Sequence, residues 1–134
     1  MKINKSSLLF TFILLFLITG CEKTEPDIIT TDRDKYLGTW NAVSTGTGGT
    51  RNFTLVIAAS NSAPEQIIMK GFDGGSSTSS LPATISGNDL SIITTLISGE
   101  TIAGTGTYNN GSLNFDFTVD DGQSVENRTC TATK

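Results

Sequence analysis

The stretch LNFDFTVD at residues 113–120 decides the fold, because apolar and polar residues alternate through the whole of it. Successive side chains of a β-strand point to opposite faces, so this pattern predicts a strand with one dry face and one wet face. Phe53, Leu55 and Ile57 repeat the pattern earlier in the chain. From Tyr36 onward, no window of about ten or more residues shows a convincing helical period of apolar residues. The sequence therefore predicts an all-β domain.

Turn signals divide this domain into strands. Asn109-Asn110-Gly111 and Asp120-Asp121-Gly122 are typical of tight hairpins, since Asn and Gly tolerate the positive φ that such turns require. Short links join antiparallel neighbours, which predicts an up-and-down meander. The eight predicted strands are Tyr36–Thr45, Arg51–Ala59, Glu65–Phe72, Leu81–Ser86, Asp89–Ser98, Glu100–Tyr108, Ser112–Val119 and Gln123–Thr133.

Eight meandering strands on one small core have two economical arrangements. They can close into a barrel, which removes both free edges, or they can form a two-layer β-sandwich. Gly104 and Gly106 lie within a predicted strand and open no helix. We therefore expect these glycines to ease packing or curvature rather than to bind phosphate. The strand pattern by itself leaves both the barrel and the sandwich open.

One short motif favours the barrel. Gly38-Thr39-Trp40 opens the first predicted strand, and Arg128 lies in the last one. This arrangement resembles the lipocalin (calycin) superfamily, especially the short lipocalin-like lipoproteins of Bacteroidetes. The resemblance implies a barrel in which Gly38 and Trp40 begin the first strand, Trp40 closes one end, and Arg128 packs across the indole. The alternative is that Trp40 is an ordinary core aromatic residue without an arginine partner.

The N-terminus has the features of an export signal. Lys2 and Lys5 precede the apolar run Leu8–Ile18, which is shorter than the roughly 20 residues needed to cross a bilayer. Ile18-Thr19-Gly20-Cys21 resembles the bacterial lipobox, which implies removal of residues 1–20 and lipidation of Cys21. Several acyl chains hold a protein on a membrane far better than one chain. The alternative is an ordinary cleaved signal followed by a chance cysteine.

The predicted mature protein is a tethered acidic domain. Residues 21–35 are expected to form the lipidated Cys21 and an acidic tether, and residues 36–134 the β-domain. Loss of Lys2 and Lys5 changes the formal net charge from −4 to −6, which argues against nucleic acid as a partner. We expect an outer-membrane lipoprotein that faces the periplasm or the cell surface, held through its lipid anchor.

The residue types predict a protein without catalysis, metal or cofactor. The chain contains no His, so a Ser-His-Asp or Cys-His arrangement is impossible within it. Cys130 has a strand setting and is expected to be a small buried thiol. Carboxylates near the last hairpin could bind Ca²⁺, but a turn and a wet strand face explain them adequately. These carboxylates belong to Asp116, Asp120, Asp121 and Glu126.

A closed meander would place its connections alternately at two ends. One end would carry the tether, Ser60–Pro64, Gly87–Asn88 and Asn109–Gly111; the other, away from the membrane, would carry Thr45–Thr50, Asp73–Ser80, Ser98–Gly99 and Asp120–Gly122. Trp40 would plug the membrane-side end, and long Gly/Ser/Thr-rich loops would rim the open mouth. An eight-stranded barrel either fills itself or holds one small ligand. The candidate pocket residues are Phe53, Leu55, Ile57, Ile67, Met69, Ile92, Phe115 and Phe117.

Three functions are compatible with this pattern. The leading hypothesis is a lipocalin-like lipoprotein that binds a small apolar or amphipathic ligand without catalysis. The alternative is a cell-surface module with a filled β core that contacts protein or glycan, or has a structural role. A carboxylate-only hydrolase is the third, since two carboxylates suffice for acid–base chemistry.

Overall fold

The computed structural model describes residues 32–134, and these form a closed β-barrel. The predicted signal peptide 1–20, Cys21 and the tether residues up to 31 lie outside the described residues. A short 3₁₀ turn, η1 (Phe72–Gly74), interrupts the strand succession. The strands are β1 (Gly38–Gly46), β2 (Gly49–Ala59), β3 (Gln66–Lys70), β4 (Leu81–Ser86), β5 (Asp89–Ile97), β6 (Glu100–Asn109), β7 (Ser112–Asp120) and β8 (Val125–Thr133).

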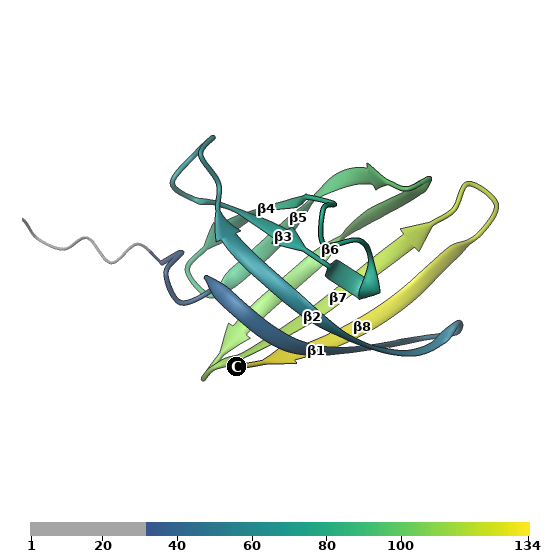
Figure 1. Ribbon diagram of the computed structural model, residues 1–134, viewed down its shortest axis with the longest axis horizontal. Helices are drawn as coiled ribbons and strands as arrows, with labels where there is room; N and C mark the ends of the chain where they lie inside the picture. The colour runs from purple at the N-terminus through teal and green to yellow at the C-terminus, as the bar shows by residue number, and fades with distance from the viewer. Residues whose placement is uncertain (1–31) are drawn as a thin grey trace, which may run out of the picture.

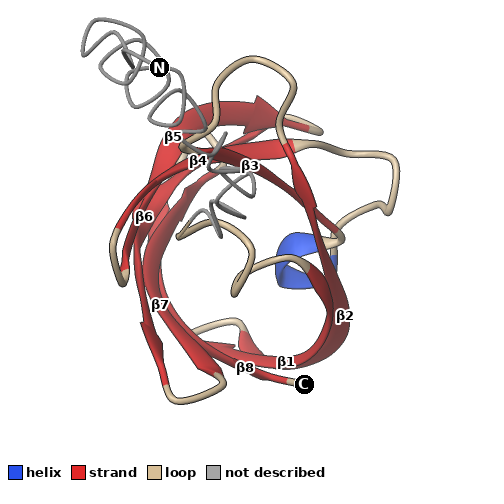
Figure 2. Cartoon of the chain, turned by 90° about the vertical axis from the view of Figure 1, so that its left-hand side faces the viewer, coloured by secondary structure: helices blue, strands red, loops and turns tan. Residues whose placement is uncertain are grey.

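Every strand pairs antiparallel with the next one along the chain (Figure 1). The barrel closes between β1 and β8, in a register that runs from Asn41 opposite Thr133 to Gly46 opposite Arg128. The closed ring of strands is visible in Figure 2. The prediction of an eight-stranded up-and-down barrel is confirmed, and the sandwich alternative is wrong. Closure satisfies the backbone groups that an open sheet would leave at its edges.

Two strands, β3 and β8, are shorter than predicted by more than one residue, each because a local feature ends the ladder. β3 stops at Lys70 because Gly71 takes a left-handed φ of 72° and turns the chain away. β8 begins at Val125 because Asp121 Oδ1 accepts hydrogen bonds from the backbone N–H groups of Gln123 and Ser124. Such side-chain contacts hold a turn where strand pairing would otherwise continue.

The alternating stretch 113–120 behaves as its pattern predicts. Leu113, Phe115, Phe117 and Val119 are buried, and the residues between them face outward. Two inward-facing glycines of β6 make room for the phenylalanine rings: a Cβ on Gly104 would lie 2.6 Å from Phe117 Cα, and one on Gly106 would lie 2.7 Å from the Phe115 ring. The expectation that these glycines serve packing is therefore confirmed.

The buried apolar residues form one cluster that draws on all eight strands. Seven of the eight candidate pocket residues are buried in it, and Phe53 packs against it half-buried. Residues 32–134 thus contain every strand of the closed barrel and its whole core. Because no strand lacks a partner, this part of the chain is a self-contained folding unit.

The residues just before the predicted boundary at Tyr36 contact the barrel. Arg33 Nη1 donates to the backbone carbonyls of Ser60 at 3.2 Å and Ala63 at 3.4 Å, and Lys35 Nζ donates to Asn88 Oδ1 at 2.7 Å. Residues 32–35, predicted as tether, therefore pack on one end of the barrel. These contacts place Arg33 and Lys35 at the end of the barrel that carries the β2–β3 and β4–β5 connections. Among residues 32–134, no helix is long and apolar enough to cross a bilayer.

Candidate functional site

The end of the barrel nearest the tether is filled by aromatic side chains. Trp40 is 0% exposed, its Nε1 donates to the Tyr36 carbonyl at 2.8 Å, and the Tyr108 ring meets its face edge-on at 6.5 Å. The Tyr36 hydroxyl donates to the Gly87 carbonyl at 3.0 Å. Burial, reinforced by the charge of Asp89, raises the pKa of Tyr36 to about 12. At this end, which we call the closed end, the hydrogen bonds of the two buried rings within residues 32–134 are neutral.

Arg128 does not pack across Trp40, so that prediction is wrong. The β1–β8 register places Arg128 opposite Gly46, which is six residues along β1 from Trp40. At about 3.3 Å per residue the two side chains start roughly 20 Å apart. The cation over the indole is Lys134, whose Nζ lies 4.4 Å from the ring centroid and donates to the Leu37 carbonyl at 2.7 Å. The register therefore gives this position to the residue directly after β8.

The opposite end, the mouth, is occupied by η1. The Phe72 ring points into the barrel and contacts three other rings edge-on, at centroid distances of 6.3 Å to Phe53, 5.3 Å to Phe115 and 4.8 Å to Phe117. Figure 2 shows η1 inside the outline of the strands. Phe72 was predicted to end a strand and Asp73 to begin an exposed rim loop. Both are buried instead, because the chain turns inward after β3.

The inward turn needs an unusual backbone. Gly71, Asp73 and Gly74 have φ values of 72°, 52° and 79°, all in the left-handed region. A Cβ on Gly71 would lie 2.7 Å from the Thr54 carbonyl oxygen, so glycine is required there for close approach as well. Asp is among the few other residues that visit this region readily. Strained residues of this kind persist where their surroundings hold them, often at functional sites.

Asp73 is held by charge. Its carboxylate is 5% exposed; Oδ1 accepts from Ser44 Oγ and from Arg128 Nε at 3.2 Å, and Oδ2 accepts from Arg51 Nη1 at 2.7 Å. Charge-assisted hydrogen bonds of this kind are roughly twice as strong as neutral ones. Together with Glu126, these side chains form the mouth cluster: Ser44, Arg51, Asp73, Glu126 and Arg128.

Arg128 is the centre of the mouth cluster. Its side chain is 0% exposed, and its Nη1 donates to Glu126 Oε1 at 2.9 Å. Its Nη2 donates to Ser44 Oγ and to the Gly49 carbonyl, both at 3.1 Å. Gly46 allows the side chain to cross β1, since a Cβ there would lie 2.7 Å from Arg128 Cγ. A buried guanidinium is tolerated only when its hydrogen bonds are satisfied.

Glu126 links the mouth cluster to the β1–β2 turn. Its Oε1 accepts from the Gly48 N–H at 2.6 Å and from Thr47 Oγ1 at 3.3 Å. The hydrogen bond from Gly48, and then the charge of Arg128, lower the pKa of Glu126 below its usual value. This carboxyl therefore stays ionised, and it pairs with the positive charge of Arg128 from the side of the β1–β2 turn.

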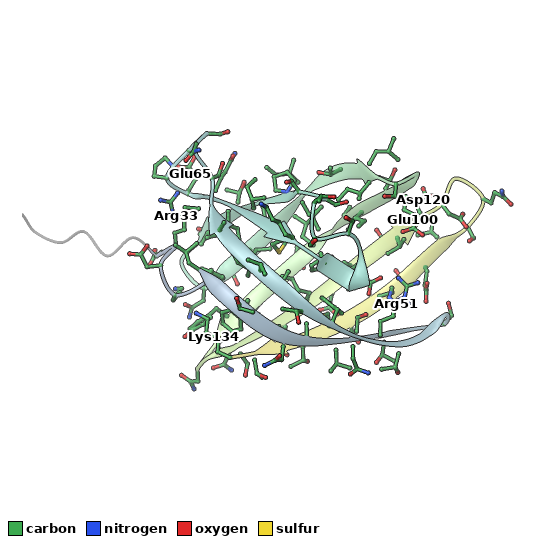
Figure 3. The ribbon with its side chains drawn as sticks, viewed as in Figure 1. Arg33, Arg51, Glu65, Glu100, Asp120 and Lys134 are labelled. Atoms are coloured by element: carbon green, nitrogen blue, oxygen red, sulfur yellow. The ribbon has the colours of Figure 1, made fainter. Side chains whose placement is uncertain are left out.

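A partly open cavity of about 210 Å³ lies at the mouth, beside η1. Its apolar wall includes Met69, Phe72 and Ile102, and Figure 3 shows Arg51 and Glu100, two of its polar residues, at the same end of the barrel. Of the eight predicted pocket residues, Met69 alone lines this cavity; the others lie against one another in the core. The full lining is Arg51, Met69, Phe72, Asp73, Gly74, Gly75, Ser76, Ser79, Leu81, Ile97, Ser98, Glu100 and Ile102.

The sequence contained weak signals for these missed residues. Phe72-Asp73-Gly74-Gly75 has the composition of a loop, but its aromatic side chain can be buried only if the loop turns inward. The contacts that matter join Asp73 to Arg51 and Arg128, which are 22 and 55 positions away in the chain. No local pattern predicts contacts at such separations.

Of the carboxylates near the last hairpin, Asp120 and Asp121 hold the local turn. Asp120 Oδ1 accepts from the Gly122 N–H at 2.8 Å, and the backbone N–H groups of Gln123 and Ser124 lower the pKa of Asp121. Asp116 lies on the outer face of β7, and Glu126 turns to Gly48 and Arg128. Within residues 32–134, no three His, Cys, Asp or Glu side chains come together as metal ligands would.

Cys130 is a buried thiol on β8. Burial raises its pKa to about 12, and the negative charge of Asp73 adds to the effect. The thiolate is the nucleophilic form, so this side chain is a weak nucleophile at neutral pH. It belongs to the core between Ser44 and Phe115, its neighbours on β1 and β7.

The comparisons with known proteins return no relative. No protein-family model matches the chain, and neither a curated protein nor a solved structure matches it significantly. The barrel and the geometry of its mouth are therefore the observations from which a function can be argued.

Proposed function

We propose that this protein is a membrane-anchored, lipocalin-like lipoprotein that binds a small amphipathic molecule at the mouth of its barrel, without catalysis. Lipid on Cys21 would hold it at the outer membrane, facing the periplasm or the cell surface, with the mouth directed away from the bilayer. The tether-end contacts of Arg33 and Lys35 support that orientation, because they place the start of the domain at the closed end.

The cavity beside η1 carries the proposal. Its walls combine the apolar side chains of Leu81, Ile97 and Ile102 with the charges of Arg51 and Glu100. Small-molecule sites are typically concave and mostly apolar, with a few polar groups that fix orientation. An engineered apolar cavity of about 150 Å³ accommodates benzene, so a volume of about 210 Å³ suits a ligand of similar or slightly larger size.

The packed interior narrows the class of ligand. Leu55, Ile67 and Phe115 lie deep in the barrel and are buried against other side chains. A long lipid tail has no room there while η1 stays in place. The proposed ligand is therefore small, with an apolar part against Met69 and Ile102 and a polar part near Arg51.

Binding can be tested on residues 32–134 with three probes that share one apolar body: 3-phenylpropanol, 3-phenylpropanoate and 3-phenylpropylamine. We expect at least one probe to bind in a titration followed by NMR, with shift changes confined to the mouth. Ile102→Trp should abolish binding because it fills the cavity. Ile93→Trp, on the outer face of β5, is the matched control and should leave binding unchanged.

The membrane anchor has a separate test. Cys21→Ser should move the protein from the membrane fraction to the soluble fraction, because the thiol that carries the lipid is gone. Retention of the variant on membranes would refute the anchor and leave the barrel proposal unaffected.

The filled core favours a second candidate function. A barrel packed with its own side chains serves equally well as a rigid support for surface contacts with protein or glycan. If none of the three probes binds the wild type, and Ile102→Trp has the same melting temperature as the wild type, the small-ligand proposal is wrong. The surface-contact function then takes its place.

A further inference from the structure

We propose that Phe72 and Asp73 occupy a carboxylate-binding site in place of a ligand, and that the protein takes up small carboxylates with an apolar body when η1 moves out. This inference deepens the proposed function and rests on it, because it concerns the same mouth. It names both the ligand class and the segment that regulates access.

The first step concerns the apolar half of the site. The Phe72 ring sits among Phe53 of β2 and Phe115 and Phe117 of β7. Those three residues are fixed by strand pairing, whereas Phe72 lies on a segment between strands. If η1 left, the three rings would line an apolar pocket that joins the existing cavity, since Phe72 is also part of the cavity wall.

The second step concerns the charged half. Within the mouth cluster two arginines face two carboxylates, Asp73 and Glu126. Arg128 is fully buried on β8, and Glu126 balances it from the outer side only. Without Asp73 the buried guanidinium would keep Glu126 as its one anion and its Nε would lose its acceptor, which is costly. When η1 moves out, binding of another carboxylate at the position of Asp73 therefore becomes favourable.

The third step concerns the backbone of η1. The Gly74 N–H donates to the Gly71 carbonyl at 3.2 Å and the Gly75 N–H to the Phe72 carbonyl at 2.9 Å, both within the segment. Moving the segment outward therefore breaks no strand pairing. It also relieves the left-handed conformation of Asp73, a residue type for which that region carries some cost. The exposed residues 74–78 that follow give the segment room to move.

These steps define the ligand by what η1 supplies. The segment presents one carboxylate next to one apolar ring, so a ligand that replaces it must carry both. A neutral alcohol would not replace the charge of Asp73 beside Arg51 and Arg128, and an amine would add a like charge. The site should therefore discriminate among molecules of the same shape by the sign of their charge.

The test compares binding of the three phenylpropyl probes to wild type and Asp73→Ala by calorimetric titration of residues 32–134. We expect Asp73→Ala to bind 3-phenylpropanoate about tenfold or more tightly than wild type, because the internal competitor is lost. The affinities for 3-phenylpropanol and 3-phenylpropylamine should not rise. Asp116→Ala, which removes an exposed carboxylate from the outer face of β7, is the matched control and should leave all three affinities unchanged.

Two further variants protect the test. Asp73→Asn keeps the size of the side chain and should also bind 3-phenylpropanoate more tightly than wild type, even if Asp73→Ala folds poorly. Adding Arg128→Met to Asp73→Asn should cancel the gain. Equal gains for the acid and the alcohol, or no gain in Asp73→Asn, would overturn the inference.

The outcome also separates this inference from the proposed function. If wild type binds the probes and Ile102→Trp prevents it, but Asp73→Asn brings no gain, the mouth binds ligands and η1 is not a surrogate. If wild type binds nothing and Asp73→Asn binds the acid, η1 is a surrogate and the cavity of the wild type is not itself the binding site.

Discussion

Both ends of the barrel are filled by buried side chains, but the polar contacts that hold these side chains differ. At the closed end the buried aromatic residue Trp40 belongs to a strand, and its indole N–H and the Tyr36 hydroxyl meet backbone carbonyls. At the mouth the buried aromatic residue Phe72 belongs to a short turn, and the neighbouring Asp73 meets two arginines. One end is therefore closed mainly by neutral hydrogen bonds of buried rings, with the exposed Lys134 over the indole, and the other by the ion pairs of a segment between strands.

This difference indicates where the molecule can change. Removing Trp40 from its place would require β1 to leave its pairing with β2 and β8. Removing Phe72 requires η1 to swing outward, which breaks the contacts of Asp73 with Arg51 and Arg128 but no strand pairing. Binding sites are drawn from the parts of a protein that open at low cost. The mouth, and not the closed end, is therefore where we propose that a ligand binds.

The comparison predicts unequal costs for two alanine substitutions. Trp40→Ala should destabilise the domain by about 3–5 kcal/mol, because the rigid closed end cannot collapse onto the space left behind. Phe72→Ala should cost clearly less, because its space adjoins the partly open cavity and the loop can rearrange. The measurement is urea denaturation of residues 32–134, followed by circular dichroism because Trp40 is the single tryptophan.

Equal costs for these two variants would contradict the comparison. A loss at Phe72 as large as the loss at Trp40 would show that η1 is a fixed part of the core. Amide hydrogen exchange provides an independent check: residues 71–80 should exchange faster than β1 in the wild type, and Phe72→Ala should raise exchange at the mouth only.

Local patterns predicted the fold because strand signals are local. The alternation in residues 113–120 and the turn at Asn109-Asn110-Gly111 act over a few positions, and successive hairpins leave little choice of neighbour. Closure did not follow from the strands alone, which left the sandwich open, and the Gly38-Thr39-Trp40 motif favoured the barrel. The strand ends were less accurate where a left-handed glycine, Gly71, or a side-chain acceptor, Asp121, ended the ladder.

The site was harder to predict because it depends on contacts between distant residues. A shift in the β1–β8 register decides whether Arg128 or Lys134 faces Trp40, and nothing in either strand fixes that register by itself. Asp73 in a glycine-rich stretch has the composition of an exposed turn. Its burial follows from the positions of Arg51 and Arg128 in the closed barrel, which only the assembled strands determine.

A second prediction concerns the neutral hydrogen bond at the closed end. Tyr36→Phe should cost about 0.5–1.5 kcal/mol at neutral pH, because the Gly87 carbonyl loses its donor. The pKa of Tyr36 is raised from 10.0 to about 12 in the folded protein, so the folded state holds this proton longer than the unfolded state. Stability from this group is fully present below pH 10 and is lost as the pH rises toward 12.

The pH dependence is measured as the difference in unfolding free energy between wild type and Tyr36→Phe. The difference should shrink from pH 10 to pH 12, because only the wild type has a phenol at this position. Cys130, whose pKa is also raised, is present in both proteins and cancels. A difference that stays constant over this range would refute the buried hydrogen bond of Tyr36.

The smallest expected effect concerns the cation at the closed end. Lys134 is exposed, and its ammonium lies over the Trp40 ring while donating to the Leu37 carbonyl. Lys134→Met keeps the aliphatic stem and removes the charge, and should cost about 0.5 kcal/mol, as expected for a cation–π contact in water. Urea denaturation followed by Trp40 fluorescence measures it, with Lys70→Met, on the exposed end of β3, as the control. A loss as large as that of Trp40→Ala would mean that the closed end, like the mouth, depends on charge, and the contrast between the two ends would not hold.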